Sequence, residues 1–398
     1  MSELNYLEKL LDGTEVEWKA LGDVTSVLRG KRLTKNLLSA EEKFPVFHGG
    51  LEPLGYYNKS NRPANTVMII NVGASAGTVG YSTVDFWSSD GCFCLEHNEL
   101  LNNRFLYFAL IGYQSLLKSK VRVAGIPTLD AIVVNKLLIP IPCPENPEKS
   151  LAIQSEIVRI LDKFTALTAE LTAELTAELT ARKKQYNYYR DQLLSFEEGD
   201  VEWKALEEVS DIYDSLHQTP QYTENGLSMI RVTDIKNGYV DLNNTLKVNN
   251  EVFATFTKKY SPQKNDLVMS RVGSYGDVGI IPLDNSACMG QNTVVIHPRI
   301  NSSYLFYILS SNIGQNFIER NVGGGSQKTL SLRSIKAIPI PLVSEKEQFR
   351  IASILGKFDT LTNSISEGLP REIELRQKQY EYYRDLLFSF PKPDSVTN

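Results

Sequence analysis

Two short stretches of this chain are near copies of each other. EVEWKALGDV occupies residues 15–24 and DVEWKALEEV occupies residues 200–209, a displacement of 185 positions. A second pair is displaced by 194 positions, with KQYNYYRDQLLSF at residues 184–196 and KQYEYYRDLLFSF at residues 378–390. Between these anchors, IPIP at residues 139–142 returns at residues 338–341. The chain is therefore a tandem duplication of a unit of about 190 residues.

Each copy has a globular part and a helical part. Residues 25–140 and 210–341 contain β-branched runs at residues 66–72 and 292–297, which predict strands. Aromatic and aliphatic residues at helical spacing predict helices over residues 103–117 and 303–317. Residues 151–194 and 345–388 carry apolar residues every three or four positions, which predicts a long helix in each. The predicted fold is α/β (α+β), with two mixed globules separated by two long helices.

The boundaries of these parts predict five segments. They are a short N-terminal segment (1–24), the first globule (25–143), a central helical region (144–209), the second globule (210–342) and a C-terminal helical region (343–398). A chain of 398 residues is long enough for several separate cores.

The two helical regions carry matching apolar ladders. Through three copies of TAEL, the first has a leucine every four residues: Leu167, Leu171, Leu175 and Leu179. The same places in the second hold Leu361, Ile365, Leu369 and Ile373. Matching stripes predict an antiparallel coiled-coil pair that spaces the globules, whereas the TAEL run alone also fits a solvated spacer helix. Gly368 and Pro370 predict a kink or a break in the second helix.

The formal charge of −5 conceals an uneven distribution. Residues 24–140 carry +4, residues 210–341 carry +2, and the remaining segments carry −11. Basic globules suit duplex DNA, with phosphate contacts for affinity and base-edge contacts for specificity. The DNA-contact candidates in the first globule are Arg29, Lys31, Arg32, Lys118, Lys120 and Arg122. Those in the second are Arg231, Lys258, Lys259, Arg271, Gln327, Lys328 and Arg333.

Catalytic and metal signatures are weak. The glycines of VGASAGTVGY and RVGSYGDVGI (Gly73, Gly77, Gly80 and Gly273, Gly276, Gly279) predict strand-connecting turns with positive φ, because no P-loop lysine follows them. The Glu-Trp-Lys triplets at residues 17–19 and 202–204 lack the acidic partner of a nuclease motif, so each Trp is expected to pack at the base of a helix. Cys92, Cys94 and His97 lack a fourth ligand, and we expect neither a metal nor a cofactor on this chain.

The cysteine usage and the amino terminus predict a reducing compartment. None of the four cysteines belongs to a disulfide framework, and the first residues resemble no secretory leader. No window approaches eighteen consecutive apolar residues, so no segment is expected to span a membrane. We therefore expect a soluble cytoplasmic protein.

The duplicated EWKAL, IPIP and QYxYYRD segments, with the TAEL run, resemble the specificity subunit of type I restriction-modification systems, in particular the IC subclass. The resemblance implies that the globules are target recognition domains, each reading half of a bipartite asymmetric DNA site. The three remaining segments are then conserved regions, whose helices set the spacer and dock two modification (methyltransferase) subunits. Two restriction (motor-nuclease) subunits would complete the enzyme. S-adenosylmethionine, ATP and magnesium are expected on these partners.

A second interpretation assigns the chain no role on DNA. It is a non-catalytic scaffold or adaptor whose two globules bind protein or carbohydrate. An autonomous methyltransferase is a weaker alternative, since the chain has no Asn-Pro-Pro-Tyr run.

Overall fold

The computed structural model describes residues 4–196, 199, 201–236, 238–324, 328–363 and 368–391. The chain divides into two compact units. Unit 1 comprises residues 1–173 and 374–398, and unit 2 comprises residues 174–373. Both ends of the chain thus belong to unit 1.

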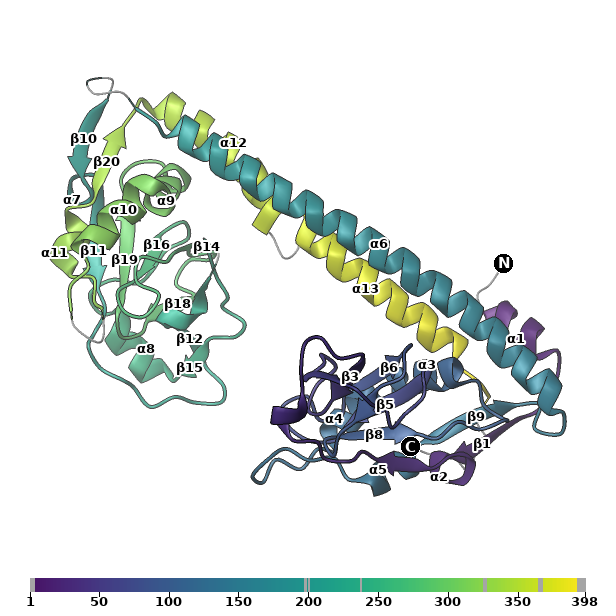
Figure 1. The fold of residues 1–398 in the computed structure, drawn as a ribbon. Helices are drawn as coiled ribbons and strands as arrows, with labels where there is room; N and C mark the ends of the chain where they lie inside the picture. The colour runs from purple at the N-terminus through teal and green to yellow at the C-terminus, as the bar shows by residue number, and fades with distance from the viewer. Residues whose placement is uncertain are drawn as a thin grey trace. The chain divides into compact units, whose positions relative to one another are not determined.

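Unit 1 contains three sheets and a group of short helices (Figure 1). Its strands are β1 (Val16–Ala20), β2 (Val27–Arg29), β3 (Phe44–Phe47), β4 (Gly55–Tyr57), β5 (Thr66–Ile70), β6 (Val79–Ser82), β7 (Trp87–Ser88), β8 (Cys92–Leu95) and β9 (Leu138–Pro142). Its helices are α1 (Leu4–Leu11), α2 (Leu21–Val24), η1 (Lys35–Leu37), α3 (Asn103–Gly112), α4 (Gln114–Ser119) and α5 (Ala131–Asn135), with the first part of α6 (Pro147–Leu193) and the last part of α13 (Gly368–Leu387).

Unit 2 repeats this plan with additional strands. Its strands are β10 (Glu202–Ala205), β11 (Ser210–Asp214), β12 (Leu227–Ile230), β13 (Ile235–Lys236), β14 (Gly238–Val240), β15 (Leu246–Val248), β16 (Leu267–Ser270), β17 (Val278–Ile280), β18 (Ala287–Met289), β19 (Thr293–Pro298) and β20 (Pro339–Leu342). Its helices are α7 (Leu206–Val209), η2 (Val232–Asp234), α8 (Asn250–Thr257), α9 (Ser302–Ser310), α10 (Asn312–Asn321), α11 (Leu332–Lys336) and α12 (Glu345–Asn363), with the last part of α6 and the first of α13.

The central sheets of the two units share four strands in the same order. Unit 1 has the order β2-β8-β5-β6, and unit 2 has the order β11-β19-β16-β17-β14-β13. The first four strands correspond, since each set descends from the same segments of the duplicated sequence. The strand runs predicted at residues 66–72 and 292–297 are confirmed as β5 and β19. The mixed α/β character of both globules is therefore confirmed, and unit 2 extends the shared sheet by two strands.

The predicted helices at residues 103–117 and 303–317 are each interrupted. The first breaks at Tyr113, between α3 and α4, and the second breaks at Ser311, between α9 and α10. Ser311 caps α10 by accepting a hydrogen bond from the backbone N–H of Ile313, at 3.2 Å. Local capping therefore starts a new helix where the apolar spacing alone suggested continuity.

In each globule, the EWKAL segment forms a strand that pairs with the strand formed by the IPIP segment. β1 pairs antiparallel with β9, and β10 pairs antiparallel with β20. Trp18 packs against the cluster that contains the start of α6, and its Nε1 donates to the carbonyl of Pro391 at 2.8 Å. The expected place at a helix base is confirmed for Trp18. It is wrong for Trp203, which is 46% exposed.

Helix α6 is continuous over 47 residues, which confirms the first long helix. The second region forms two helices, α12 and α13, separated by residues outside the described part of the chain. Gly368 starts α13 with φ of +79°, a backbone conformation that glycine favours. Pro370 lies in the first turn, where its missing N–H costs no helical hydrogen bond. The predicted break at this pair is confirmed.

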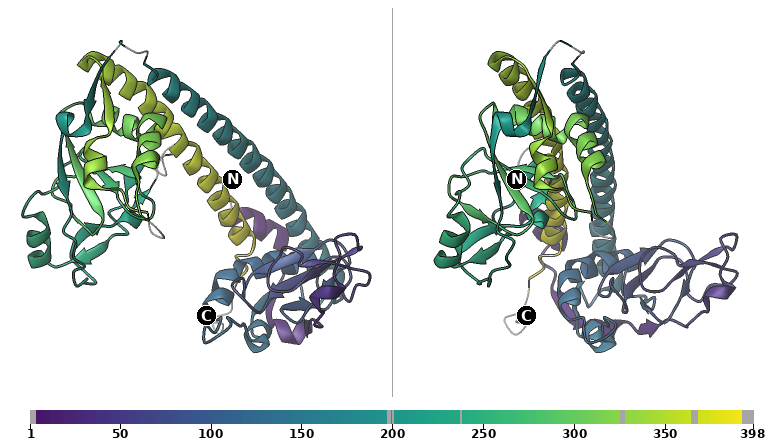
Figure 2. Two further views of the ribbon diagram at one scale, coloured as in Figure 1. Left: turned by 60° about the vertical axis from the view of Figure 1, so that its left-hand side comes forward. Right: turned by 90° about the vertical axis from the view of Figure 1, so that its left-hand side faces the viewer.

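Equivalent ring contacts join the helices within each unit. In unit 1, Phe164 of α6 stacks on Tyr383 of α13, with centroids 5.3 Å apart. In unit 2, Tyr189 of α6 stacks on Phe358 of α12 at 5.6 Å. The ribbons of α6 and α12 run alongside each other there (Figure 2). Phe358 stands 194 positions after Phe164, and Tyr383 stands 194 positions after Tyr189. The second ring pair therefore repeats the first with the two helical regions exchanged. The helices are antiparallel in both places, because early residues of one meet late residues of the other.

Gln154 and Gln348 attach these helices to their globules in the same way. The Oε1 of Gln154 accepts from the backbone N–H of Asn102 at 2.8 Å, and that of Gln348 accepts from Asn301 at 3.0 Å. Asn102 and Asn301 are in turn the N-caps of α3 and α9. The repeated glutamine thus holds the first helix of each globule to the long helix that follows it.

The apolar ladder of α6 is only partly covered. Leu171, Leu175 and Leu179 are half-buried, but Leu167 is 51% exposed, so its assignment to a buried stripe is wrong. Leu167 lies about 60° around the helix from Phe164, whereas Leu171 and Leu175 lie within about 20° of it. In the partner ladder, Leu361, Leu369 and Ile373 are half-buried. Ile365 lies outside the described residues.

The glycine-rich segments are turns, as predicted, at four of six positions. Gly73, Gly77, Gly273 and Gly276 all have positive φ, between 76° and 88°. Gly80 and Gly279 instead lie inside β6 and β17. A Cβ on Gly80 would lie 2.3 Å from the side chain of Leu51, so close packing explains the glycine there. Within the described residues, no helix combines the length and apolarity needed to cross a membrane.

Candidate nucleic-acid interface

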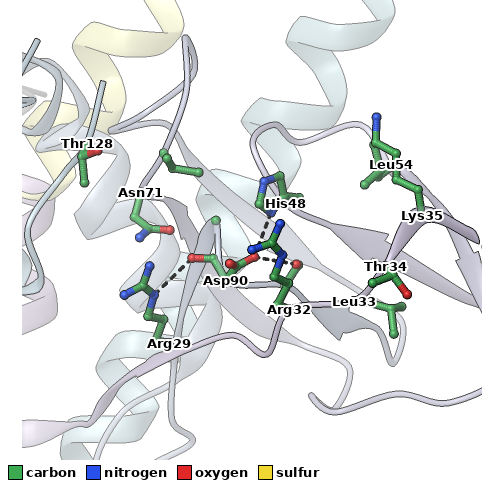
Figure 3. Close-up of a pocket in the computed structure, with 13 residues that line it drawn as sticks. Arg29, Arg32, Leu33, Thr34, Lys35, His48, Leu54, Asn71, Asp90 and Thr128 are labelled. Carbon is green, nitrogen blue, oxygen red and sulfur yellow. Dashed lines mark hydrogen bonds and ion pairs between the residues drawn. The ribbon is translucent and has the colours of Figure 1, made fainter. Parts of the chain in front are cut away.

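The first globule has a cationic cavity of about 550 Å³ between β2, the start of β8 and the end of β5 (Figure 3). Its ionisable lining residues are Arg29, Arg32, Lys35, His48 and Asp90. Three permanent cations against one carboxylate favour an anionic partner such as a phosphate. The cavity therefore brings together two of the six candidates predicted in this globule, Arg29 and Arg32.

Arg29 and Asn71 lie on opposite sides of the entry to β8. The backbone N–H of Asn71 donates to the carbonyl of Gly91 at 3.1 Å, and β2 pairs with β8 from the other side. The Nε of Arg29 donates to the carbonyl of Asp90 at 3.2 Å. This bond anchors the guanidinium through its Nε, and its two Nη groups have no hydrogen bond to any residue that the structure describes. A guanidinium held in this way can form a bidentate contact with a base or a phosphate.

Asn71 is 3% exposed, and its Oδ1 has no hydrogen-bond partner among the described residues. A buried amide oxygen without a partner is costly, typically about 1–3 kcal/mol. Beside it, the Nδ1 of His48 is likewise buried without a hydrogen-bond partner among the described residues, 3.4 Å from the carboxylate of Asp90. The hydroxyl of Ser89 donates to that carboxylate at 3.0 Å. The polar groups at the base of the cavity are thus incompletely satisfied by the globule itself.

The same place in the second globule is filled by an internal ion pair. Asp214 stands 185 positions after Arg29, and Arg271 stands 200 positions after Asn71. The Nη1 of Arg271 lies 2.8 and 2.9 Å from the two carboxylate oxygens of Asp214, and its Nε donates to the carbonyl of Leu330 at 3.0 Å. Arg271 therefore does not offer a free guanidinium to a ligand, against the sequence-based expectation.

We expect Arg271→Ala to destabilise unit 2 by about 2–3 kcal/mol, because it leaves a partly buried carboxylate without its partner. Lys258→Ala, at an exposed position of the same globule, should change stability by less than about 0.5 kcal/mol. Hydrogen exchange across β16 and β19 measures the difference within unit 2. Equal protection in the two variants would show that the ion pair contributes nothing to stability.

The other candidates in the first globule are exposed. Lys118 and Lys120 lie at the end of α4, and Arg122 begins the loop that follows it. Lys31 is also exposed, and its carbonyl accepts from the Nε1 of Trp87 at 2.8 Å. These four side chains are free to meet a phosphate, but none of them lines the cavity.

Candidates in the second globule differ in their environments. Arg231 bonds Asp234 through two donors, at 3.1 and 2.8 Å, and this hydrogen bonding raises the pKa of the Arg231 guanidinium. Arg231 is therefore held in an ion pair at the N-cap position of η2, and its contact with DNA stays a prediction. Lys258, Lys259 and Arg333 are exposed. Lys328 lies over the ring of Tyr275, 5.8 Å from its centroid, and Gln327 falls outside the described residues.

Sequence reasoning missed most of the polar residues that line the first cavity, among them Lys35, His48, Asn71 and Asp90. Only Lys35 stood near a predicted basic cluster, and the others lie in separate segments that the sheet brings together. Cys92 and Cys94 are buried in β8, and the Nε2 of His97 lies 2.9 Å from the hydroxyl of Thr66. Among the described residues, no cluster of three His, Cys, Asp or Glu side chains could hold a metal ion.

Comparisons with known proteins agree on one family. The type I restriction modification DNA specificity domain matches twice, at residues 14–181 and 198–375. The type I restriction enzyme EcoR124I/EcoR124II specificity subunit of Escherichia coli is 40% identical over the full length of both chains. The EcoprrI specificity subunit of Escherichia coli is 34% identical and covers 92% of this chain and 93% of its own. The crystal structure of an S subunit from M. genitalium shares the fold, with a TM-score of 0.50 and 19% identity over 96% of this chain and 98% of its own.

Proposed function

Because this chain belongs to the family of type I restriction-modification DNA specificity subunits, we propose that each globule reads one half of a bipartite asymmetric DNA site. The chain provides sequence specificity and is not itself the catalyst of the system. We assign the reading surfaces to residues 25–143 and 210–342, as two target recognition domains. The helical regions between and after them then set the spacer between the two half-sites.

The observation that supports this proposal is a shared scaffold with different surface chemistry. Both units have the same four-strand order, the same glutamine anchor and the same ring stack between helices. At equivalent places, however, one globule has an open cationic cavity and the other has an internal ion pair. Two copies of one scaffold with unlike surfaces are suited to two unlike half-sites on DNA.

The chemistry of the system is proposed to reside on partner subunits. The helices are repeated in the two units, which favours two symmetric docking sites for two modification subunits that carry S-adenosylmethionine. Two restriction subunits with ATP and magnesium would complete the endonuclease, in the cytoplasm where the DNA lies. From the TAEL run we propose that the chain belongs to the IC subclass.

Replacing residues 25–143 with a second copy of residues 210–342 tests the reading role directly. We expect the assembled methyltransferase to modify a site whose two halves are identical and inverted, because both globules then carry the same surface. Methylome mapping of cells that express the native or the exchanged chain with its modification subunit measures this change. An unchanged asymmetric site would refute the assignment, and a scaffold for protein or carbohydrate would confer no sequence-specific methylation.

A further inference from the structure

The loop at residues 122–128 of the first globule presents two branched apolar side chains to solvent. Val123 is 80% exposed and Ile126 is 71% exposed. Two reciprocal backbone hydrogen bonds between Arg122 and Thr128, at 2.9 and 3.0 Å, close the loop at its base. Gly125, between the two apolar residues, has φ of +85° and allows the sharp reversal. The loop is therefore closed at its base, with its two apolar side chains exposed.

This loop rises from the wall of the cationic cavity. The carbonyl of Pro127 accepts from the backbone N–H of Gly73 at 2.9 Å, and the N–H of Leu129 donates to the carbonyl of Asn71 at 2.9 Å. Thr128 lines the cavity itself (Figure 3). Exposed apolar groups and the cations of the cavity thus share one edge of the globule.

The scaffold does not require an apolar tip. In the second globule, Gly323 and Thr329 close the equivalent loop with hydrogen bonds of 3.1 and 2.7 Å, and the N–H of Leu330 donates to the carbonyl of Arg271. Its sequence between Gly323 and Lys328 reads GGSQ and has no apolar side chain. Val123 and Ile126 are therefore specific to the surface of the first globule, because the fold that both globules share does not need them.

The surroundings of the loop identify its partner. Arg122 at the base of the loop is exposed, and Arg29, Arg32 and Lys35 line the adjoining cavity, so the partner carries negative charge next to an apolar group. In the major groove of B-DNA, the thymine C5-methyl group lies between two phosphate backbones. We infer that Val123 and Ile126 contact thymine methyl groups in the half-site read by the first globule. This inference rests on the proposed function.

Uracil in place of thymine removes only the methyl group and so tests the contact. The affinity of the assembled methyltransferase is measured for a duplex that contains its mapped site. Each thymine of both half-sites is then replaced in turn by uracil. At one or two positions of a single half-site, we expect affinity to fall about fourfold, the value of one buried methyl group. The double variant Val123→Ser with Ile126→Ser should bind the thymine duplex about as weakly as the native complex binds the uracil duplex, and should not distinguish the two.

A matched variant separates this contact from general surface effects. Val84→Ser makes the same type of change at another exposed position of the same globule and should retain the full response to uracil. Sequence-specific binding that is indifferent to uracil at every position, or a double variant that keeps the native response, would overturn the inference while leaving the proposed function intact. Absence of sequence-specific binding by the native complex would instead overturn the proposed function.

Discussion

Deletion of residues 172–175, one TAEL unit of α6, should shorten the recognised spacer by one base pair. Four residues of helix contribute about 6 Å of length and about 40° of rotation. One base pair of B-DNA contributes about 3.4 Å and 34–36°. The rotation of four helical residues matches that of one base pair more closely than their length does. This rotation decides whether the DNA-reading surface of the globule faces its groove. A one-pair change therefore restores the orientation of the second globule on DNA.

Methylation at the original site should fall about a thousandfold, the lower end of the ratio between specific and non-specific DNA binding. Methylome mapping reads both the lost site and the shortened one in the same experiment. Glu174→Gln is the matched control, because it alters an exposed residue of the same TAEL repeat without changing the length of the helix. An unchanged spacer in the deletion variant would show that α6 does not set the distance between half-sites.

The fold was predictable where the duplication repeats a pattern. The long helix α6, the strands β5 and β19 and the break before α13 all follow from periodicity and from glycine and proline positions. The breaks at Tyr113 and Ser311 were not predictable, because the apolar spacing runs across them unchanged. Capping by a single hydroxyl, as at Ser311, decides such a break and leaves no periodic signal.

The candidate site was less predictable than the fold. Arg29 and Asn71 are 42 positions apart and meet only because β2 and β5 lie on either side of β8. The order of strands in a sheet is not contained in local sequence, so neither the cavity nor the Asp214–Arg271 pair could be anticipated. Arg231 is different, because Asp234 follows it by three positions at the start of a helical turn, a spacing typical of a cap. That local signal could have predicted the ion pair between Arg231 and Asp234.

The C-terminal end of the chain completes unit 1, which gives the second large effect. Leu387 and Phe390 are buried in the cluster that contains Phe105, Ile157 and the amino-terminal helix α1. We expect the double variant Leu387→Ala with Phe390→Ala to destabilise unit 1 by about 5–10 kcal/mol, the sum of the usual costs of removing one buried leucine and one buried phenylalanine. A loss of that size is comparable to the whole stability of a typical domain.

Hydrogen exchange resolved by peptide distinguishes the two units in this experiment. Protection should be lost in β5, α3 and the start of α6, while β16, β19 and α9 keep theirs, because the cluster around Leu387 contains residues of unit 1 alone. Leu375→Ala changes an exposed leucine of the same helix α13 and should leave both patterns unchanged. Equal loss of protection in both units would show that they unfold together, and the C-terminal end would then stabilise the whole chain and not one reading domain.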